Sequence, residues 1–317
     1  MNLIEKNFLC PLSHLGFIFA QGADADSFLQ GQLSNDIRLL TGERAQISSY
    51  NSPKGRMLAV LNLTRTDAGI LIQLERSVLE ATLKRLKMFV LRAKVTLADV
   101  SDPISALGLY GPEAGQTLAE AGLAAPAAIN DCSRHGALCV LRQHGETPRF
   151  VVQGPAIDIK MLQNKLSARI PSASTDTWRR LEIMAGVPAV FPQTSDHFVP
   201  QMTNLDQLGG ISFTKGCYTG QEIVARLHYL GNLKRRMFYC RAQASGIEPG
   251  VSVHDANSEQ AVGEVAQVAN ADDGCLLSVV LQLTHAQSEQ LRLGSPNGPP
   301  LSRPHSSIAE MHGPAVA

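Results

Sequence analysis

The sequence lacks the features that mark several large protein classes. No basic segment followed by a long apolar run occurs near the N-terminus, and the apolar stretch 15–20 is much too short to cross a bilayer. The 28 basic residues balance the 28 acidic ones, so no overall field attracts the chain to nucleic acid or anionic lipid. We therefore expect a cytoplasmic protein that binds neither membranes nor nucleic acid directly.

Cysteine is scarce and dispersed. No CxxC pair is present, and no cluster has the spacing of a zinc or iron–sulfur site, so we expect no resident metal. The sequence also has no GxGxxG after a strand, no Walker A loop and no HExxH, which argues against nucleotide-binding enzymes and zinc proteases. Most of the cysteines are expected to be small buried hydrophobes. The six are Cys10, Cys132, Cys139, Cys217, Cys240 and Cys275.

Hydrophobic periodicity predicts an α+β fold with antiparallel sheets and helices packed on them. Pro53 and Gly55 indicate a tight turn that joins two strands into a hairpin. The predicted helices cover residues 23–33, 78–91, 113–121, 156–170 and 176–186. The predicted strands cover residues 45–50, 56–63, 69–75, 94–97, 106–110, 137–142 and 149–153.

Beyond residue 235 the pattern changes to short β-type runs separated by Gly and Asp/Asn turns. This pattern is typical of a small β-barrel, which we expect over residues 236–301. Residues 1–235 would then form two interleaved α+β domains. Residues 294–317 hold five of the 17 prolines, and we expect residues 302–317 to form a flexible tail.

The segment around Cys217 has its own local signals. A short strand is expected over residues 211–213, and Thr219 and Glu222 have the spacing of a capping box, which predicts a helix beginning at Thr219. Glu222 and Arg226 are spaced for an ion pair along this helix. The expected buried stripe of the helix is Ile223, Leu227 and Leu230, with Gly231 as the stop.

These signals place Cys217 just before a helix N-terminus, with Lys215 nearby in sequence. A helix dipole and a cationic neighbour both favour the thiolate form of a cysteine. Most isolated cysteines are nevertheless buried and structural. From these residues alone, a functional and a structural role for Cys217 both stay open.

The run Lys215–Glu222 together with Arg226 resembles the signature K-G-C-[aromatic]-x-G-Q-E-x-x-x-R of the YgfZ-like family, which it matches at eight specified positions. The similarity covers most of residues 15–240. Further segments that resemble the family are 31–37, 53–56, 185–188, 198–201 and 203–210, together with Trp178.

The resemblance implies the three-domain ring of the glycine-cleavage aminomethyltransferase, to which this family is related, and tetrahydrofolate as the ligand of a central pocket. It also implies an accessory role, rather than that of an ordinary enzyme, in the assembly or repair of iron–sulfur enzymes. These include one that methylthiolates tRNA. Iron–sulfur client or assembly proteins are the implied partners.

The resemblance also suggests roles for individual residues, and each has an alternative. Cys217 and Lys215 would carry the chemistry. Trp178 would pack on the folate ring, or else anchor the core, and Gln201 would read the pterin edge, or else lie in a surface loop. Tyr218 would border the pocket or pack under its loop, and Arg226 would hold a folate carboxylate or simply pair with Glu222.

Three positions depart from the related sequences. No carboxylate occurs from Arg56 to Leu63, where the aminomethyltransferase carries the aspartate that assists chemistry at the folate nitrogen. Met184 stands where related helices often have glutamate, and Leu15 where some relatives have an aromatic residue. The first departure argues against aminomethyl transfer. A folate-dependent one-carbon transferase and a scaffold that has lost folate remain as alternatives.

Overall fold

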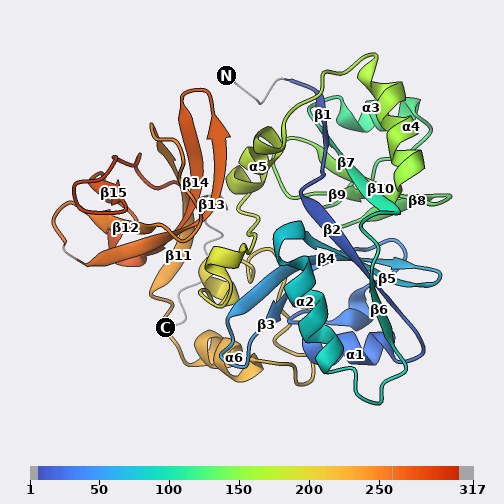
Figure 1. Cartoon of the computed structure of the whole chain (residues 1–317), viewed down its shortest axis with the longest axis horizontal. Helices are drawn as coiled ribbons and strands as arrows, with labels where there is room; N and C mark the ends of the chain where they lie inside the picture. The colour runs from blue at the N-terminus through green and yellow to red at the C-terminus, as the bar shows by residue number, and fades with distance from the viewer. Residues whose placement is uncertain (1–5, 259, 307–317) are drawn as a thin grey trace.

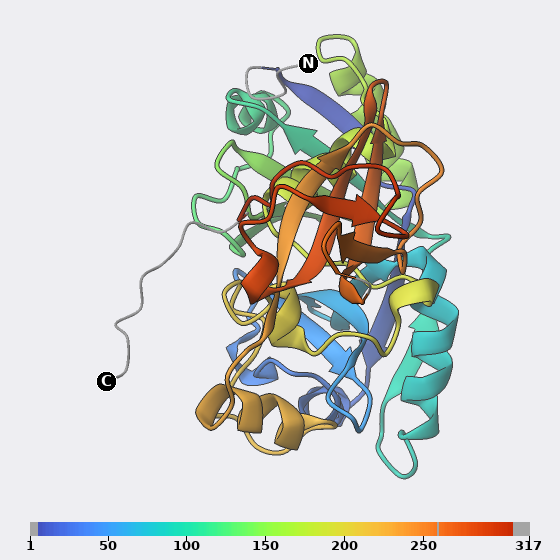
Figure 2. The ribbon, with the colours of Figure 1, turned by 90° about the vertical axis from the view of Figure 1, so that its left-hand side faces the viewer.

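The computed structural model describes residues 6–258 and 260–306. Three five-stranded sheets form the framework, and all of their strand pairs are antiparallel. Figure 1 shows the three sheets with helices packed against them, and Figure 2 shows the C-terminal sheet in front of the others. The expected α+β class with antiparallel sheets is confirmed.

The first sheet has the strand order β3-β4-β5-β2-β6. Its hydrophobic core lies under α1 and α2, where Leu79 and Leu86 are buried against the strands. The predicted hairpin is confirmed: Gly55, at φ +68°, donates its N–H to the Ser52 carbonyl at 2.9 Å. The elements are β2 (Leu15–Gln21), α1 (Ala25–Gln32), β3 (Gln46–Asn51), β4 (Met57–Thr66), β5 (Gly69–Glu75), α2 (Arg76–Met88) and β6 (Thr96–Asp99).

The second sheet has the strand order β1-β7-β10-β9-β8. One of its faces packs on α3 and α4 through a core that includes Leu107, Val152 and Ile159. Its other face packs on Trp178 of α5 (Thr175–Met184). The elements of this sheet are β1 (Phe8–Pro11), β7 (Ile104–Tyr110), α3 (Ala114–Glu120), β8 (Cys132–His135), β9 (Leu138–Arg142), β10 (Arg149–Pro155) and α4 (Ala156–Ser167).

The third sheet is curled and has the strand order β11-β14-β13-β12-β15. Residues 299–305 run between its two edge strands: Leu301 N–H donates to the Leu291 carbonyl at 2.9 Å, and Ser302 N–H to the Arg241 carbonyl at 2.8 Å. This segment makes the sheet barrel-like. The strands are β11 (Arg235–Ala242), β12 (Ser252–Asp255), β13 (Ala261–Ala271), β14 (Gly274–Gln282) and β15 (Leu291–Leu293).

Two expectations about connecting segments are wrong. Residues 211–213 form no strand, because their backbone leaves the sheets and leads into the Cys217 loop. Residues 302–305 are not a loose tail, since His305 and Tyr239 of β11 exchange both backbone hydrogen bonds at 2.9 Å. The rest of the expected tail, residues 307–317, lies outside the described residues.

Helix α5 is the element that joins the framework. Figure 1 shows it between β13 and β14 on one side and β1 on the other. Its Trp178 belongs to the core of the second sheet, whereas Ile183 packs with Ala269 and Leu276 of the third. Residues on different faces of one short helix therefore contact different sheets, so α5 is well placed to position a site between them.

Candidate functional site

Cys217 is the only exposed cysteine among the described residues; the other five are buried and all six are free thiols. This confirms that most cysteines act as small buried hydrophobes. Cys217 lies in the loop before α6 (Gln221–Tyr229), and its thiol has no hydrogen bond to any described residue. The thiol is therefore open to reagents or to a partner.

Lys215 holds the Cys217 loop against α1. Its buried ammonium donates to the carbonyl oxygens of Gln30, Leu33 and Asn35 at 2.7, 2.7 and 2.8 Å. A lysine ammonium has three protons, so its full donor capacity is directed to these carbonyls rather than to the thiol. Lys215 thus fixes the position of the loop, and a direct part in the chemistry stays a prediction.

The surroundings of Lys215 set its charge state. Burial lowers the pKa of Lys215 to about 8, and Asp36 opposes the shift. The ammonium also lies 5.1 Å from the ring centre of the buried Tyr218, a cation–π contact. Burial raises the pKa of Tyr218, so this phenol stays neutral. Tyr218 therefore packs under the loop, which is the second of the two positions expected for it from the sequence.

Gly220 fixes the other end of the loop. It is the N-cap of α6, at φ +80°, and a Cβ at this position would lie 2.4 Å from the Ser52 carbonyl oxygen. The expected capping box is wrong: no side chain caps α6, and the helix begins at Gln221 rather than at Thr219. The close approach of the 51–55 hairpin imposes a left-handed backbone at residue 220, which is incompatible with a Thr219 cap.

The expected buried stripe of α6 is also wrong. Only Val224 is buried in this helix, whereas Ile223 is 40% and Leu230 85% exposed. The helix lies at the edge of the molecule (Figure 1), and Val224 is the residue that it buries in the core. Arg226 is exposed and makes no ion pair with Glu222 or any other described residue, so its proposed role in holding a carboxylate rests on the family match alone.

Gln201 lies beneath α6 and not in a surface loop. It is 3% exposed, and its Nε2 donates to the Val224 carbonyl at 2.7 Å. Its Oε1 is buried without a hydrogen-bond partner among the described residues. Gln201 therefore stabilises the position of α6, and its expected part in reading a pterin stays a prediction.

A second candidate site is a narrow cavity where α5 meets β4 and β5. The cavity has a volume of about 30 Å³. Asn62 of β4 and Gln73 of β5 are directly opposite across the sheet, and neither side-chain amide has a hydrogen bond within residues 6–258 and 260–306. The lining residues are Leu15, Val60, Asn62, Gln73, Leu74, Glu75, Glu182, Val187, Pro188 and Ala189.

Two carboxylates contribute to this cavity. Glu75 pairs with Arg179 at 2.9 Å, and both side chains are only 10% exposed. Burial raises the pKa of Glu75 to about 7, Arg179 lowers it and Glu182 raises it further. Glu75 therefore titrates near neutral pH, unlike an exposed glutamate.

Trp178 takes the core role and does not line the cavity. It is 1% exposed, and its ring fills the space over Gly108, where a Cβ would lie 2.5 Å from the ring. The guanidinium of Arg149 lies 5.1 Å from the ring centre, and the indole Nε1 donates to Glu182 Oε1 at 3.1 Å. Trp178 thus contacts the cavity through Glu182, and its expected part in packing on a folate ring stays a prediction.

Sequence reasoning missed most of the cavity. It noted an acid missing at Met184, but the same helix directs Glu182 into the cavity, two residues earlier. The available signal was the charged pair Arg179 and Glu182, which are one turn apart on a helix that also carries the apolar Leu181. From β4, which has no carboxylate in residues 57–63, the cavity receives the neutral amide of Asn62.

The residues of the cavity fit the chemistry of a pterin ring. A pterin presents an amide and amino N–H groups together with acceptor atoms, which a carboxylate and two free amides can match. A volume of about 30 Å³ holds roughly two water molecules, so a bound ring would have to widen the cavity. Asn62, Gln73 and Glu182 are the residues that would hold such a group.

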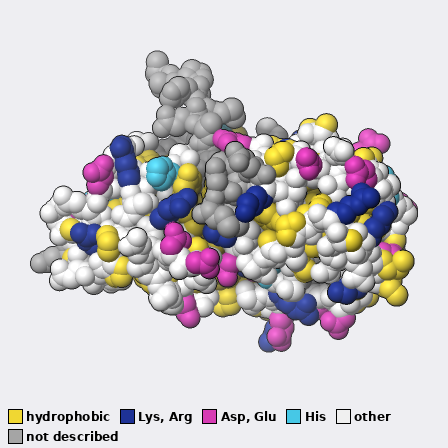
Figure 3. All heavy atoms as spheres, turned by 90° about the horizontal axis from the view of Figure 1, so that it is seen from above, with side chains coloured by type: hydrophobic (Ala, Val, Ile, Leu, Met, Phe, Trp, Pro, Cys, Tyr) yellow, Lys and Arg dark blue, Asp and Glu magenta, His cyan; other side chains and the backbone are white. Residues whose placement is uncertain are grey.

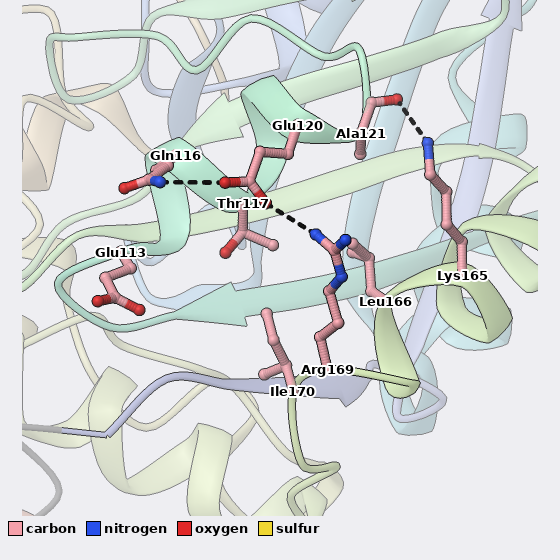
Figure 4. A pocket seen from close by; sticks show the side chains of 9 residues that line it. All are labelled: Glu113, Gln116, Thr117, Glu120, Ala121, Lys165, Leu166, Arg169 and Ile170. Carbon is pink, nitrogen blue, oxygen red and sulfur yellow. Dashed lines mark hydrogen bonds and ion pairs between the residues drawn. The ribbon is translucent and has the colours of Figure 1, made fainter.

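A larger cavity elsewhere offers no comparable set of free groups. It has a volume of about 440 Å³ and lies between α3 and α4 (Figure 4). Its charged side chains largely satisfy one another: Glu120 accepts from Arg169 and Gln116, each at 3.0 Å, and Lys165 donates to the Ala121 carbonyl at 3.3 Å. We therefore assign it no functional role.

The surface carries mixed charges. Basic and acidic side chains are interspersed with apolar ones on the face shown in Figure 3. No helix within the described ranges combines the length and the apolar character needed to traverse a bilayer. Within the same ranges, no three His, Cys, Asp or Glu side chains are grouped so as to hold a metal ion.

Comparison with solved structures defines the class of protein. No family model matches the chain. The aminomethyltransferase T of the glycine cleavage system from Bartonella henselae superposes with a TM-score of 0.77 at 18% identity, covering 96% of this chain and 86% of that chain. The arrangement of three sheets around α5 is therefore an aminomethyltransferase-like fold, as the resemblance implied.

Comparison of sequences then gives the family. The chain is 32% identical over 286 residues to the tRNA-modifying protein YgfZ of Colwellia psychrerythraea, covering 88% of this chain and 86% of that protein. Identity of this extent shows common descent over nearly the whole chain. The protein belongs to the YgfZ family.

Proposed function

We propose that this protein is a cytoplasmic, reduced-folate-binding accessory protein that supports the assembly or repair of iron–sulfur enzymes, including enzymes that modify tRNA. The observation that carries the proposal is the contrast among the cysteines: Cys217 alone is exposed, on a loop fixed by Lys215, while the other five are buried. Membership of a family with a member named as tRNA-modifying supports the same role.

The fixed loop suits Cys217 to meet a partner. Lys215 and Gly220 hold the loop at both ends, so the exposed thiol is presented with little loss of conformational freedom on binding. The thiolate, rather than the thiol, is the form that attacks sulfur or binds metal. Iron–sulfur client or assembly proteins are therefore the partners that we propose for this surface.

The cavity beside α5 is the proposed site of tetrahydrofolate. Glu182 is held by the indole N–H of Trp178 at 3.1 Å, which leaves its second carboxylate oxygen for a ligand. The free amides of Asn62 and Gln73 supply both donors and acceptors next to it. When bound, the folate would supply a one-carbon carrier, and the chain's own residues would orient its ring.

Complementation tests the role of the thiol. In a bacterial strain that lacks its own member of this family, the unmodified protein should restore the activity of iron–sulfur enzymes and Cys217→Ser should not. Thr214→Ser, an equally exposed change in the same loop, is the matched control and should restore activity fully. Full restoration by Cys217→Ser would remove the thiol from the mechanism.

One observation favours a folate-dependent one-carbon transferase as a second candidate. Glu75 lines the cavity with its pKa raised to about 7, close to the value that suits a proton-transfer group. Against it, β4 contributes the amide of Asn62 where a carboxylate would be needed. The test is an assay of aminomethyl transfer from a donor to tetrahydrofolate. Transfer by the unmodified protein that is lost in Glu75→Gln would favour the transferase over the accessory role.

A further inference from the structure

Helix α5 presents different residues to two separate cavities. Glu182 lines the narrow cavity beside β4 and β5. Arg180 and Met184 instead line a second cavity, where α5 meets the third sheet. Ile183 packs into the third sheet with Leu276 and so fixes this side of the helix.

The second cavity is large enough for a small molecule. Its volume is about 370 Å³, within the range of roughly 300–1,000 Å³ that is usual for such sites. The lining combines apolar and charged side chains from three segments, namely α5, the third sheet with its β13–β14 turn, and residues 300–302. The residues that matter here are Arg180, Met184, Arg241, Asp273, Leu276 and Leu301.

The charged groups of this cavity have few partners among the described residues. Arg180 donates through Nη2 to Thr177 Oγ1 at 3.2 Å, but its Nε is buried without a hydrogen-bond partner among the described residues. Neither Arg241 nor Asp273 forms an ion pair in the part of the chain that the structure describes. Two cations face one carboxylate, so the lining carries a net positive charge.

We propose that this cavity is a second ligand site, which takes a small molecule with an apolar body and one anionic group such as a carboxylate. Met184, Leu276 and Leu301 would cover the apolar body. Arg180 and Arg241 would receive the anionic group, which would also satisfy the buried Nε of Arg180. The proposal is independent of the folate role, because the two cavities share no lining residue.

A pair of probes that differ in charge alone tests this site. Naphthalene-2-carboxylate and naphthalene-2-carboxamide are titrated into the whole protein by calorimetry. The carboxylate should bind at least about tenfold more tightly than the amide, since it forms charge-assisted hydrogen bonds with the arginines. Arg180→Met combined with Arg241→Met should bring the two affinities together. Arg235→Met, on the same strand as Arg241 but outside the cavity, should change nothing.

The location of the probe needs its own variant. Ala271 lines the cavity at the end of β13, and Ala271→Trp should fill the space and abolish binding of both probes without altering the thermal midpoint greatly. Saturating tetrahydrofolate should leave the affinity for the carboxylate unchanged. Three results would overturn the proposal: no saturable binding of the carboxylate, equal affinity for the two probes in the unmodified protein, or undiminished binding by Ala271→Trp.

Discussion

Replacing Lys215 by methionine tests the claim that one buried ammonium holds the Cys217 loop. The change keeps the length of the side chain but removes hydrogen bonds of 2.7, 2.7 and 2.8 Å to three carbonyl oxygens. Hydrogen bonds to a charged group contribute roughly 1.5–3 kcal/mol each, against several kcal/mol for burying the charge. We therefore expect the free energy of unfolding to fall by about 2–4 kcal/mol.

Two measurements on this variant separate a loosened loop from a general loss of stability. Urea denaturation gives the free energy of unfolding, and the rate of alkylation under native conditions reports on Cys217, the one exposed thiol. The alkylation rate should change in Lys215→Met even at low denaturant concentrations, where the protein is fully folded. Lys54→Met, at an exposed lysine, is the control and should leave both quantities unchanged. If Lys215→Met has the same free energy of unfolding and the same alkylation rate as the unmodified protein, Lys215 does not hold the loop.

Three further predictions concern the cavity, the Cys217 loop and the core. Because the folded-state pKa of Glu75 is raised from 4.5 to about 7, its contribution to stability is present below pH 4.5 and lost as the pH rises to 7. The difference in free energy of unfolding between the unmodified protein and Glu75→Gln should therefore fall by on the order of 3 kcal/mol between pH 4.5 and pH 7. A difference that does not depend on pH would contradict this prediction. Gly220→Ala should lower the free energy of unfolding by about 1–3 kcal/mol, because residue 220 has a φ of +80° and lies against the Ser52 carbonyl. An unchanged free energy of unfolding would contradict the role of Gly220 in fixing the Cys217 loop. Trp178→Ala should cost about 3–5 kcal/mol in urea denaturation, whereas a loss under 1 kcal/mol would mean that the indole is not a core anchor.

The regular elements were predictable because each follows from local periodicity. The predicted strand at residues 69–75 has the same bounds as β5, and the helix predicted over residues 78–91 overlaps α2, which buries Leu79 and Leu86. The turn at Pro53 and Gly55 is likewise set by backbone preferences of those two residues. In each case the residues that determine the structure are neighbours in the chain.

The Cys217 region was harder to predict because distant contacts determine it. The left-handed backbone of Gly220 results from the 51–55 hairpin, and the position of Lys215 from carbonyl groups about 180 residues earlier. No local pattern indicates either contact. The motif itself was recognisable, but the physical role of its lysine was visible only in the folded chain.

The cavity shows the same limit. Asn62 and Gln73 are 11 residues apart and become neighbours through the register of β4 and β5. Glu182 reaches them from α5, whose position depends on Trp178 filling the space over Gly108. Sequence reasoning favoured a folate contact over a core role for the lone tryptophan, which stays a prediction, and it overlooked the carboxylate that the indole holds.

The most direct test of a folate site beside α5 is a calorimetric titration with tetrahydrofolate. The account predicts saturable binding to the unmodified protein, weakened at least about tenfold when Asn62→Leu and Gln73→Leu remove the free amides. Gln116→Leu, in the cavity between α3 and α4, is the matched control and should bind like the unmodified protein. Absence of any saturable heat, or unchanged affinity in the Asn62→Leu and Gln73→Leu variant, would contradict the account.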